Sequence, residues 1–406
     1  MSSYHALSEQ EATAYARRLP DFFAPDAELS CREIGDGNLN LVFHIQDQGS
    51  GKSVILKQAL PYAKVVGESW PLTLDRARIE SEALAVQGRL CPELTVRLIA
   101  YEPELALTVM EDLSDHVIMR RGLIEGRRYP HFAEHISEFL ARTLFFTSDL
   151  GMNQQEKKIQ TGRFINPELC KITEDLIFDD PYTDSENNSF DEAIRDEVER
   201  IWQDSALHLE VMLLRQKFLT EGQALLHGDL HTGSVFVTET STKVIDPEFA
   251  YYGPMGFDVG AIIANLLLNY AAQTGWKEGA DLADYRSYLL QTATSIWEQF
   301  HVKFSSLWDE QLVDRMAATP GYKEHYMKQL LQDTVGFAGC KMVRRIIGLS
   351  HVADIDTIPD ASRKEKAQRL ALAIGKTLIK RNRSLASIDE VLDIVQTQWS
   401  AIEQGK

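Results

Sequence analysis

The chain has 406 residues, of which 44% are hydrophobic, and it carries a net charge of −18. A chain of this length can bury a large core and fits two lobes better than one. The acidic balance argues against non-specific nucleic-acid binding, which needs a basic face. It leaves ATP binding open, because a local cluster of positive charge and magnesium can hold a nucleotide in an acidic protein.

The four cysteines are far apart in the sequence and form no CxxC pair: Cys31, Cys91, Cys170 and Cys340. Such a pattern fits reduced, buried thiols in a cytosolic protein. The first residues lack the basic region and apolar run of a signal peptide. The most apolar helical segment, 259–268, is too short to cross a bilayer. We therefore expect a cytoplasmic protein that makes no contact with a membrane.

The N-terminal third predicts a small sheet preceded by a helix. Residues 8–18 read as a helix capped by Ser8, with Glu11 completing a capping box three positions later. Apolar, β-branched runs predict strands at residues 28–35, 41–45, 53–57, 96–101 and 105–110.

Residues 35–40, a glycine-containing loop, join the first two strands, and Lys57 ends the third. This order opens the N-lobe of protein-kinase-like folds, in which glycines let backbone N–H groups approach phosphates and the lysine pairs with the α and β phosphates. By itself the signal is weak. Gly-x-Gly hairpins are common, the third glycine of the full pattern is missing, and a single strand lysine usually faces solvent.

An insertion at 61–71, which mixes apolar and charged residues around Trp70, reads as an irregular but packed flap. A helix at 74–90 follows, with Thr73 or Asp75 as its cap. In a kinase-like fold this helix supplies the glutamate that pairs with the strand lysine and fixes its aim. Glu80 is the preferred candidate and Glu82 the alternative, and either one could instead be an exposed helix acid.

The last N-terminal strand runs into Glu111, Asp112 and Leu113. In a two-lobed kinase this exit is the hinge, where backbone groups read the adenine edge. An ordinary strand-to-loop exit is the alternative, and the order of the elements favours the hinge.

Beyond Pro130 the periodicity is helical. Helices are expected at 131–148, once or twice within 190–219, and at 257–269, 281–304, 324–349, 363–379 and 387–402. Residues 167–184, with clustered Asn, Asp and Pro, read as loop. Asp258 lies in the first turn of its helix, where a carboxylate suits the helix dipole, or it braces the neighbouring loop.

The most informative stretch is Leu226-His227-Gly228-Asp229-Leu230-His231-Thr232-Gly233-Ser234, followed by Asp246-Pro247-Glu248. Two short strands, 235–237 and 243–245, form a hairpin between these motifs and bring their carboxylates to one end of a small sheet. Phosphoryl transfer needs this pairing, because one carboxylate orients the hydroxyl nucleophile while others hold magnesium. A polar loop with satisfied acids is the alternative.

Arg344 and Arg345 lie within a mostly apolar helical segment. A buried arginine requires an anionic or polar partner. A structural salt bridge and a contact with substrate are both open interpretations.

The order of motifs resembles the aminoglycoside-phosphotransferase and choline-kinase branch of the protein-kinase-like fold, and within it the S-methyl-5-thioribose kinase family. The resemblance covers nearly the whole chain. The stretches that carry it are Gly35–Asn40, Gly67–Pro71, Val109–Leu113, His227–Ser234, Asp246–Glu248 and Arg344-Arg345. Two departures from protein kinases fit this family: Ser234 stands where many kinases carry a metal-binding Asn, and Asp-Pro-Glu replaces Asp-Phe-Gly.

The resemblance implies an α+β, two-lobed fold with a small antiparallel sheet in an N-lobe at 1–112 and a larger, mainly helical C-lobe at 113–406. It implies ATP-dependent phosphorylation of the anomeric hydroxyl of 5-methylthioribose in methionine salvage, by a homodimer. ATP and Mg²⁺ would be held by Asn40, Lys57, Glu111, Asp112, Leu113, Asp246, Pro247 and Glu248, with Asp246 and Glu248 on the metal. Asp229 would be catalytic, and Asp229 and Arg344 would meet the sugar.

Two other functions stay open. A kinase for another small hydroxyl substrate, of the aminoglycoside, choline or homoserine type, would bind mostly cations, which Arg344 and Arg345 disfavour. A non-catalytic, nucleotide-binding pseudokinase would not need the intact Lys57, Asp229 and Asp246.

Overall fold

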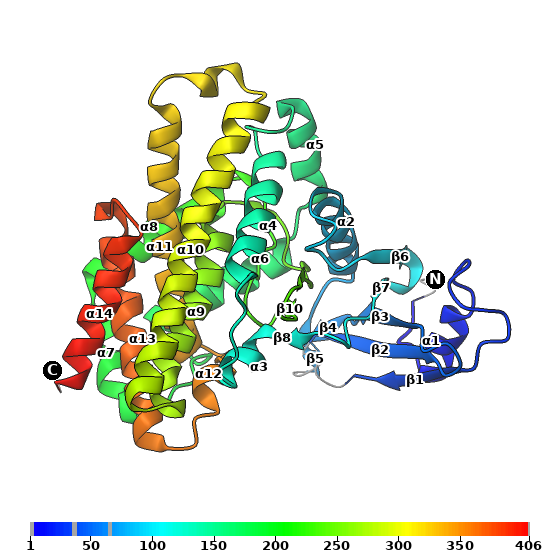
Figure 1. Ribbon diagram of the computed structural model, residues 1–406, viewed down its shortest axis with the longest axis horizontal. Coiled ribbons are helices and arrows are strands. Elements are labelled where there is room, and N and C mark those ends of the chain that lie inside the picture. The colour runs from blue at the N-terminus through cyan, green and yellow to red at the C-terminus, as the bar shows by residue number, and fades with distance from the viewer. Residues whose placement is uncertain (1–3, 35–38, 64–66, 405–406) are drawn as a thin grey trace.

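A computed structural model of the chain describes residues 4–34, 39–63 and 67–404. Its fold is α+β and two-lobed: a small antiparallel sheet at the N-terminal end adjoins a larger, mainly helical part (Figure 1). Of the predicted glycine loop, positions 35–38 lie outside the described residues, so the structure describes only its end, Leu39 and Asn40.

The N-terminal sheet has five antiparallel strands in the order β1-β2-β3-β7-β6, which places Lys57 on the central strand. Val54 and Leu56 alternate with Lys57 and point into the core under the sheet, as the period of two requires. The predicted strands are all present: β1 Leu29–Glu33, β2 Asn40–Asp47, β3 Ser53–Ala59, β6 Leu98–Glu102 and β7 Leu107–Glu111.

The first helix, α1 Glu9–Ala16, begins with the predicted capping box. The Ser8 hydroxyl accepts from the Glu11 amide, and the Glu11 carboxylate accepts from the Ser8 amide. Buried Ala12 and Ala16 then lie against the sheet in its core. The cap therefore sets where the helix starts, and its small residues set how closely it packs.

Within the insertion, which we expected to be irregular, the structure describes two short antiparallel strands, β4 Tyr62–Ala63 and β5 Gly67–Pro71, whose register shifts between Tyr62 and Ala63. Pro61 stands just before the first strand and Pro71 ends the second, where a missing N–H is tolerated. Helix α2 Asp75–Leu90 follows, and the Thr73 hydroxyl accepts from the Asp75 amide at 3.1 Å.

The helical part is built around α9 Gly256–Trp276, which is buried along almost its whole length. It packs against α10 Gly279–Gln311, α11 Tyr322–Ile347 and α13 Ala361–Arg381. The remaining helices are α3 Met119–Ile124, α4 Phe132–Phe146, α5 Gln154–Arg163, α6 Pro167–Phe178, α7 Arg195–Gln203, α8 Ser205–Thr220, α12 Ala353–Asp356 and α14 Asp389–Glu403.

Short strands line the region between the two parts. The predicted hairpin is present as β10 Val235–Val237 and β11 Thr242–Val244, and β8 Val117–Ile118 adds a third strand to it. A second pair joins β9 Ala224–Leu225 to β12 Tyr252–Gly253. These two small sheets carry the loops in which the conspicuous carboxylates lie.

Two expectations need correction. The segment predicted as loop at 167–184 begins with helix α6, because Pro167 occupies the first helical position, where its missing N–H costs nothing. The four cysteines are free, but only Cys91 and Cys340 are buried, whereas Cys31 and Cys170 are partly exposed.

Within the described residues, no helix is both long and apolar enough to span a bilayer.

Gly260 allows α9 and α11 to approach closely. A β-carbon at this position would lie 2.4 Å from the Thr334 carbonyl oxygen and 3.0 Å from the Ala338 nitrogen, both of them backbone atoms. We expect Gly260→Ala to destabilise the protein by about 1–3 kcal/mol through overpacking, measured as a lower Tm in thermal unfolding.

Gly162 in α5 is the matched control, because a β-carbon there would have no neighbour within 4 Å. Gly162→Ala should raise stability by about 0.5–1 kcal/mol through helix propensity alone. A Gly260→Ala variant with an unchanged Tm would show that the α9–α11 contact adapts.

Candidate functional site

The His-Gly-Asp loop joins β9 to β10, and its sharp turn depends on Gly228. This residue has φ of +85°, and a β-carbon on it would lie 2.2 Å from the Phe249 carbonyl oxygen. Any other side chain would push the loop away from the segment that carries Glu248. The glycine therefore keeps the two conspicuous motifs in contact.

Asp258 braces this loop, as one of our two interpretations predicted. From the first turn of α9, its carboxylate accepts from the amides of His227 at 2.6 Å and Gly228 at 3.1 Å. The His227 ring then donates from Nε2 to the Ile245 carbonyl at 2.8 Å. The position of Asp229 is thereby tied to the chain that leads directly into Asp246.

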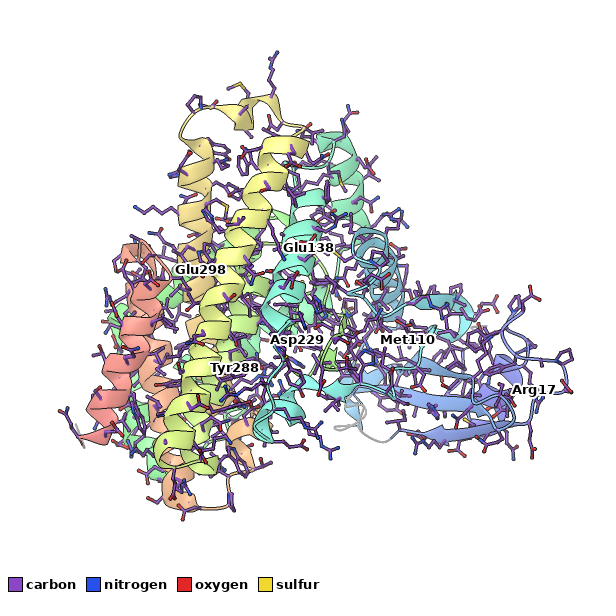
Figure 2. The ribbon with its side chains drawn as sticks, viewed as in Figure 1. Arg17, Met110, Glu138, Asp229, Tyr288 and Glu298 are labelled. Atoms are coloured by element: carbon purple, nitrogen blue, oxygen red, sulfur yellow. The ribbon has the colours of Figure 1, made fainter. Side chains whose placement is uncertain are left out.

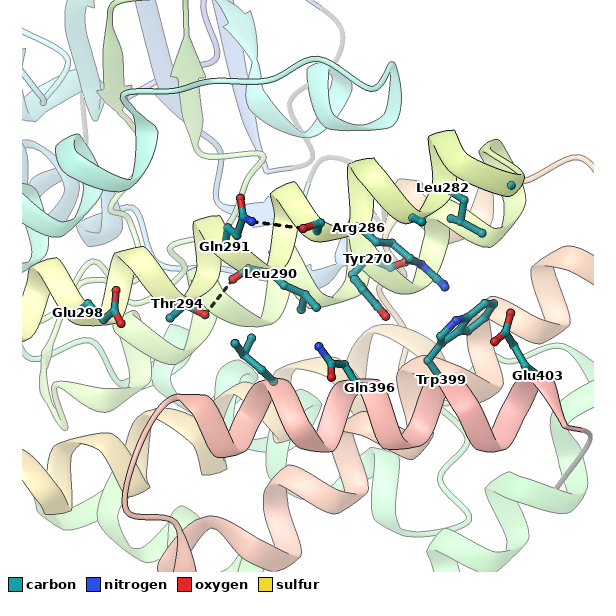
Figure 3. A pocket seen from close by; sticks show the side chains of 14 residues that line it. Tyr270, Leu282, Arg286, Leu290, Gln291, Thr294, Glu298, Gln396, Trp399 and Glu403 are labelled. Carbon is teal, nitrogen blue, oxygen red and sulfur yellow. Dashed lines mark hydrogen bonds between the residues drawn. The ribbon is translucent and has the colours of Figure 1, made fainter.

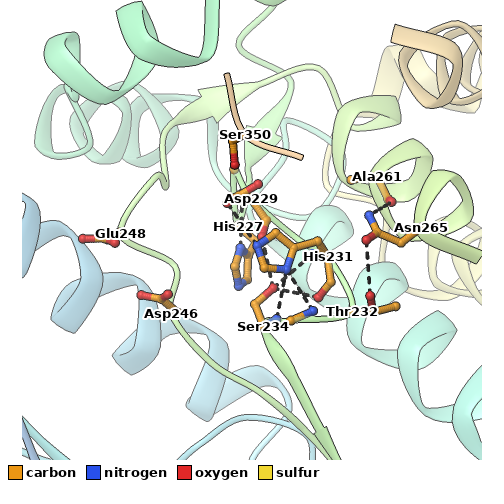
Figure 4. Close-up of polar contacts among 12 residues, drawn as sticks. His227, Asp229, His231, Thr232, Ser234, Asp246, Glu248, Ala261, Asn265 and Ser350 are labelled. Atoms are coloured by element: carbon orange, nitrogen blue, oxygen red, sulfur yellow. Dashed lines mark hydrogen bonds and ion pairs between the residues drawn. The ribbon is translucent and has the colours of Figure 1, made fainter. Parts of the chain in front are cut away.

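Asp229 lies at the end of this turn with its side chain 30% exposed, and His231 Nε2 is 3.3 Å from its carboxylate (Figure 4). The Nδ1 atom of His231 accepts from the amides of Gly233 and Ser234, so the ring proton stays on Nε2 and faces Asp229. Burial lowers the pKa of His231 to about 4, which keeps the ring neutral at pH 7.

The Asp229 carboxylate is ionised. Burial alone would raise its pKa, but His231, Lys341 and Arg345 outweigh this and hold the pKa well below its usual range. The Ser234 hydroxyl forms its hydrogen bonds within the loop: it donates to the carbonyls of Asp229 and His231 and accepts from the His231 amide. Its contacts thus suit a structural residue.

Lys57 forms ion pairs with two carboxylates. Its Nζ is 2.8 Å from Glu80 on α2 and also contacts Asp246. The structure thereby selects Glu80 over Glu82, which instead pairs with Arg78. Burial lowers the pKa of Lys57, but Asp246 and Glu80 overcome this and leave the pKa above its ordinary value.

Arg76, one helical turn before Glu80, is fully buried and holds the third carboxylate. Its Nε donates to Glu248 at 3.2 Å, and Asn40 donates to the same carboxylate from Nδ2 at 3.3 Å. The other guanidinium N–H groups donate to oxygens of Leu39, Asn40, Leu60 and Thr73. Arg76 therefore fixes both Glu248 and the end of the glycine loop.

This cluster has the charge to accept a divalent cation. Glu80, Asp246 and Glu248 contribute three negative charges, while Lys57 and Arg76 contribute two positive ones. Asp246 has a side chain 42% exposed and can face a ligand. Among the described residues no group of three or more possible ligands is preformed, but Mg²⁺ commonly takes one or two carboxylates and completes its shell with phosphate oxygens and water. The residues fit that mode.

The predicted hinge has a fixed shape. The Asp112 carboxylate accepts from Ser53 at 2.7 Å and Ser114 at 2.5 Å and lies 3.0 Å from His44 Nε2, so its side chain serves the fold. The Glu111 amide donates to the Arg97 carbonyl, and its carboxylate accepts from the Arg97 amide. Ligand contacts here would have to come from other backbone groups of 111–113.

Several cationic side chains act electrostatically on Asp229. Arg344 Nη1 donates to the Ser350 carbonyl at 3.4 Å, and Arg345 Nη1 donates to the Ser350 hydroxyl at 3.1 Å. Neither arginine forms an ion pair within the described part of the chain, so the structural salt bridge that we considered is not what holds them. Burial lowers the pKa of both, while Asp229 opposes that effect.

Lys341 and Arg120 complete this cationic group. Burial lowers the pKa of Lys341 to about 8, and its Nζ lies 3.8 Å from the centroid of the Phe257 ring. Arg120 lies 3.5 Å from Asp354 and donates to Asn265 at 3.2 Å.

Sequence reasoning did not identify several of these residues: Arg76, Arg120, His231, Lys341 and Asp354. Arg76 had a usable signal, since it lies four positions before Glu80 on one helix face. His231 lies two residues after Asp229 in the stretch that we singled out, but its contact with the carboxylate was not predicted. Arg120, Lys341 and Asp354 lie on segments whose meeting point the sequence pattern does not reveal.

Comparison with known proteins finds a matching family and similar curated proteins. Residues 30–292 match the phosphotransferase enzyme family. The methylthioribose kinase of Geobacillus sp. (strain WCH70) is 50% identical over 388 residues, which cover 96% of this chain and 95% of that protein. The methylthioribose kinase of Yersinia enterocolitica is 48% identical over 392 residues, covering 97% and 98%.

Two solved structures are similar at low identity. The choline kinase of Cryptosporidium parvum Iowa II has a TM-score of 0.47 and 12% identity, with 98% of this chain and 97% of that chain covered. A spectinomycin phosphotransferase in complex with ADP and spectinomycin has a TM-score of 0.44 and 12% identity, with 97% and 99% covered.

We expect Arg76→Lys to lower turnover by at least about tenfold, because a lysine keeps the charge but cannot reproduce the five-donor fork that holds Glu248 and the loop end. Steady-state phosphotransfer kinetics at saturating substrates would measure this loss. Arg78→Lys, two residues further along the same helix, where the side chain pairs with Asp75 and Glu82, is the control and should keep its turnover. Equal activity of the two variants would remove Arg76 from the site.

Proposed function

The chain belongs to the methylthioribose kinase family of phosphotransferases, and we propose that Asp229 is the residue that acts on the sugar hydroxyl during phosphoryl transfer. The reaction moves the terminal phosphoryl group of ATP to the anomeric hydroxyl of S-methyl-5-thio-D-ribose and yields the 1-phosphate and ADP in methionine salvage. The observation that carries the assignment of the site is the ionised, part-exposed Asp229 carboxylate, which the loop holds between the Lys57 cluster and four cationic side chains.

Lys57 lies on the central strand with Asp246 and Glu80 around it, where its ammonium can pair with the α and β phosphates of ATP. Glu80 holds the ammonium in place beside Asp246. Backbone groups of 111–113 would receive the adenine, and Asn40 would act at the phosphates from beside Glu248. Pro247 would line this region between the two carboxylates.

Asp246 and Glu248 would hold Mg²⁺ together with the phosphates. The cation supplies neutralisation of the charge that develops on the transferring phosphoryl group. Arg76 and Asn40 hold Glu248 before any nucleotide arrives, so its orientation is set in advance. The Asp246 side chain is the more exposed of the two and must exchange part of its contact with Lys57 for the ligand.

The role of Asp229 follows from its low pKa. A carboxylate that holds its proton so weakly is a poor base for an early deprotonation. Phosphoryl transfer is largely dissociative, and the hydroxyl proton becomes acidic only late. Asp229 therefore orients the anomeric hydroxyl and accepts its proton after the new P–O bond has begun to form, while the Nε2–H of His231 keeps the carboxylate in place.

Arg344 would hold the ribose hydroxyls as a planar donor.

The charge around Asp229 favours this sugar over the alternative substrates. Arg120, Lys341, Arg344 and Arg345 all act electrostatically on Asp229, His231 or one another. An aminoglycoside or choline would bring positive charge into this group and be repelled. A neutral sugar meets no such penalty.

Three further features belong to this proposal. The N-lobe would comprise 1–112 and the C-lobe 113–406, so that the Glu111–Leu113 segment joins them. The hairpin at 61–71 would close over the bound substrates and limit hydrolysis of ATP by water. The enzyme would work in the cytoplasm as a homodimer.

We expect Asp229→Asn to keep ATP binding and to lose turnover by about two to four orders of magnitude, because the shape remains while the proton acceptor is removed. Coupled ADP release with methylthioribose measures turnover, and calorimetry with ATP measures binding. Wild-type turnover in this variant would defeat the proposed role of the loop.

Arg344→Lys separates sugar recognition from chemistry. We expect the KM for methylthioribose to rise by about tenfold or more, with the KM for ATP nearly unchanged, because the lysine loses the planar fork. If the variant instead shows a lower Tm and an unchanged sugar KM, Arg344 is a structural residue.

Asp246→Asn and Glu248→Gln should each raise the Mg²⁺ concentration needed for half-maximal activity, since each removes one hard oxygen ligand of full charge. Binding of Mn²⁺ in the presence of ATP, followed by electron paramagnetic resonance, gives a second readout that does not depend on turnover. Normal metal response in both variants would place the metal elsewhere.

A further inference from the structure

A groove with a volume of about 800 Å³ lies between the first half of α10 and the C-terminal helix α14 (Figure 3). It is lined by none of the residues used in the site above, and α14 lies on the side of the helical part away from the N-terminal sheet (Figure 1). Apolar side chains, among them Leu282, Leu290 and Leu392, line it together with polar ones such as Gln396. Figure 2 shows Glu298, at one end of the groove, on α10 and apart from Asp229.

Arg286 lies at the centre of this groove and is only 4% exposed. Its guanidinium is stacked between two rings, with the Tyr270 centroid at 4.4 Å and the Trp399 centroid at 3.8 Å. The Nε atom donates to the Tyr270 carbonyl at 3.0 Å. Both terminal nitrogens, Nη1 and Nη2, are buried and have no hydrogen-bond partner among the described residues.

An arrangement of this kind is costly. A guanidinium carries four N–H bonds on its terminal nitrogens. Leaving these groups without partners, away from water, carries a penalty on the order of that for an unpaired buried ion, several kcal/mol. Ring stacking recovers only about 1–2 kcal/mol. In keeping with this cost, burial lowers the pKa of Arg286 to about 10. An anion in the groove would remove the penalty.

Two acids line the groove, Glu298 at one end and Glu403 at the end of α14. Glu403 acts electrostatically on Arg286 but is exposed, and neither acid forms an ion pair with Arg286 in the described part of the chain. Lys366 adds a second cation beside the groove, with its Nζ 4.7 Å from the centroid of the same Trp399 ring. The groove thus contains one buried cation without an ionic partner, next to apolar side chains.

We propose that this groove is a second ligand site, which binds a small organic anion with a flat apolar body. Its carboxylate or phosphate accepts from the terminal nitrogens of Arg286, and its body lies against Leu282, Leu290 and Leu392. The half-buried Trp399 ring covers the guanidinium, so it turns aside as the anion enters. Binding occurs through contacts that are separate from those of Asp229 and Lys57.

Calorimetry with 2-naphthoate and 2-naphthyl phosphate tests this site, with ADP and Mg²⁺ at saturation so that the nucleotide pocket is filled. We expect saturable binding of at least one of them with Kd below about 1 mM, equivalent to about −4.1 kcal/mol. The tighter of the two identifies the preferred anionic group. The neutral 2-naphthamide should bind at least about tenfold more weakly, because it lacks the charge. Absence of saturable binding by both anions would overturn the proposal.

Arg286→Met keeps an unbranched apolar side chain but removes the charged guanidinium, and it should weaken anion binding at least tenfold while kinase turnover is unchanged. Arg128→Met is the matched control, since Arg128 also stacks on tyrosine rings, those of Tyr285 and Tyr288, but is exposed and paired with Asp284. Equal affinity in the Arg286 and Arg128 variants would show that Arg286 is a packing residue only.

Glu403→Gln provides a test that does not depend on the folding of the Arg286 variant, because Glu403 is exposed at the end of α14. Removing its negative charge should tighten anion binding by about two- to threefold, as expected for one partly screened repulsion near the groove. An unchanged or weaker affinity in this variant would contradict the proposed position of the anionic group.

Discussion

The structure depends on one buried ionic cluster in which Lys57 and Arg76 meet the carboxylates of Glu80, Asp246 and Glu248. Its members come from the sheet, from α2 and from the segment after β11, so the cluster fastens three separate parts of the chain at one point. Removing one partner of a buried pair leaves an uncompensated charge and costs about 3–5 kcal/mol. The parts are therefore held in a single arrangement that leaves the Asp246 side chain partly exposed.

The rest of the fold transmits this arrangement to Asp229. Asp258 on α9 holds the amides at the start of the His-Gly-Asp loop, and His227 connects the same loop to the backbone just before Asp246. Because α9 is buried along almost its whole length, the loop is fixed to the centre of the helical part. The position of Asp229 relative to the Lys57 cluster is thus a property of the core, not of the loop alone.

Charge is distributed unevenly in this acidic protein. The chain has a net charge of −18, yet several cations act on Asp229, and the α10–α14 groove contains one buried arginine, Arg286. Buried cations make their surroundings selective, because they interact strongly with anions and repel other cations. Around Asp229, this charge suits the neutral sugar that we propose binds there. In the groove, the terminal nitrogens of Arg286 have no hydrogen-bond partner among the described residues.

The sequence alone determined the element types and the chemistry-bearing motifs. Apolar, β-branched runs identified the five strands, the Ser8–Glu11 box fixed the first cap, and the hairpin between Asp229 and Asp246 was evident from spacing. These features are local, so neighbouring residues carry the information. The sequence misjudged the start of α6, because proline marks both breaks and beginnings. It also missed the pairing of β4 with β5, because the mixed apolar and charged residues of that insertion show no strand pattern.

The partners of the buried charges were decided by tertiary structure only. Whether Glu80 or Glu82 meets Lys57 depends on which face of α2 lies toward the sheet. Arg76 and Glu248 are 172 positions apart, and the pattern around Arg76 is that of any helical arginine. Burial turns such a residue from a solvated surface charge into one that must find a carboxylate, and burial is a property of how distant segments pack, which no local pattern contains.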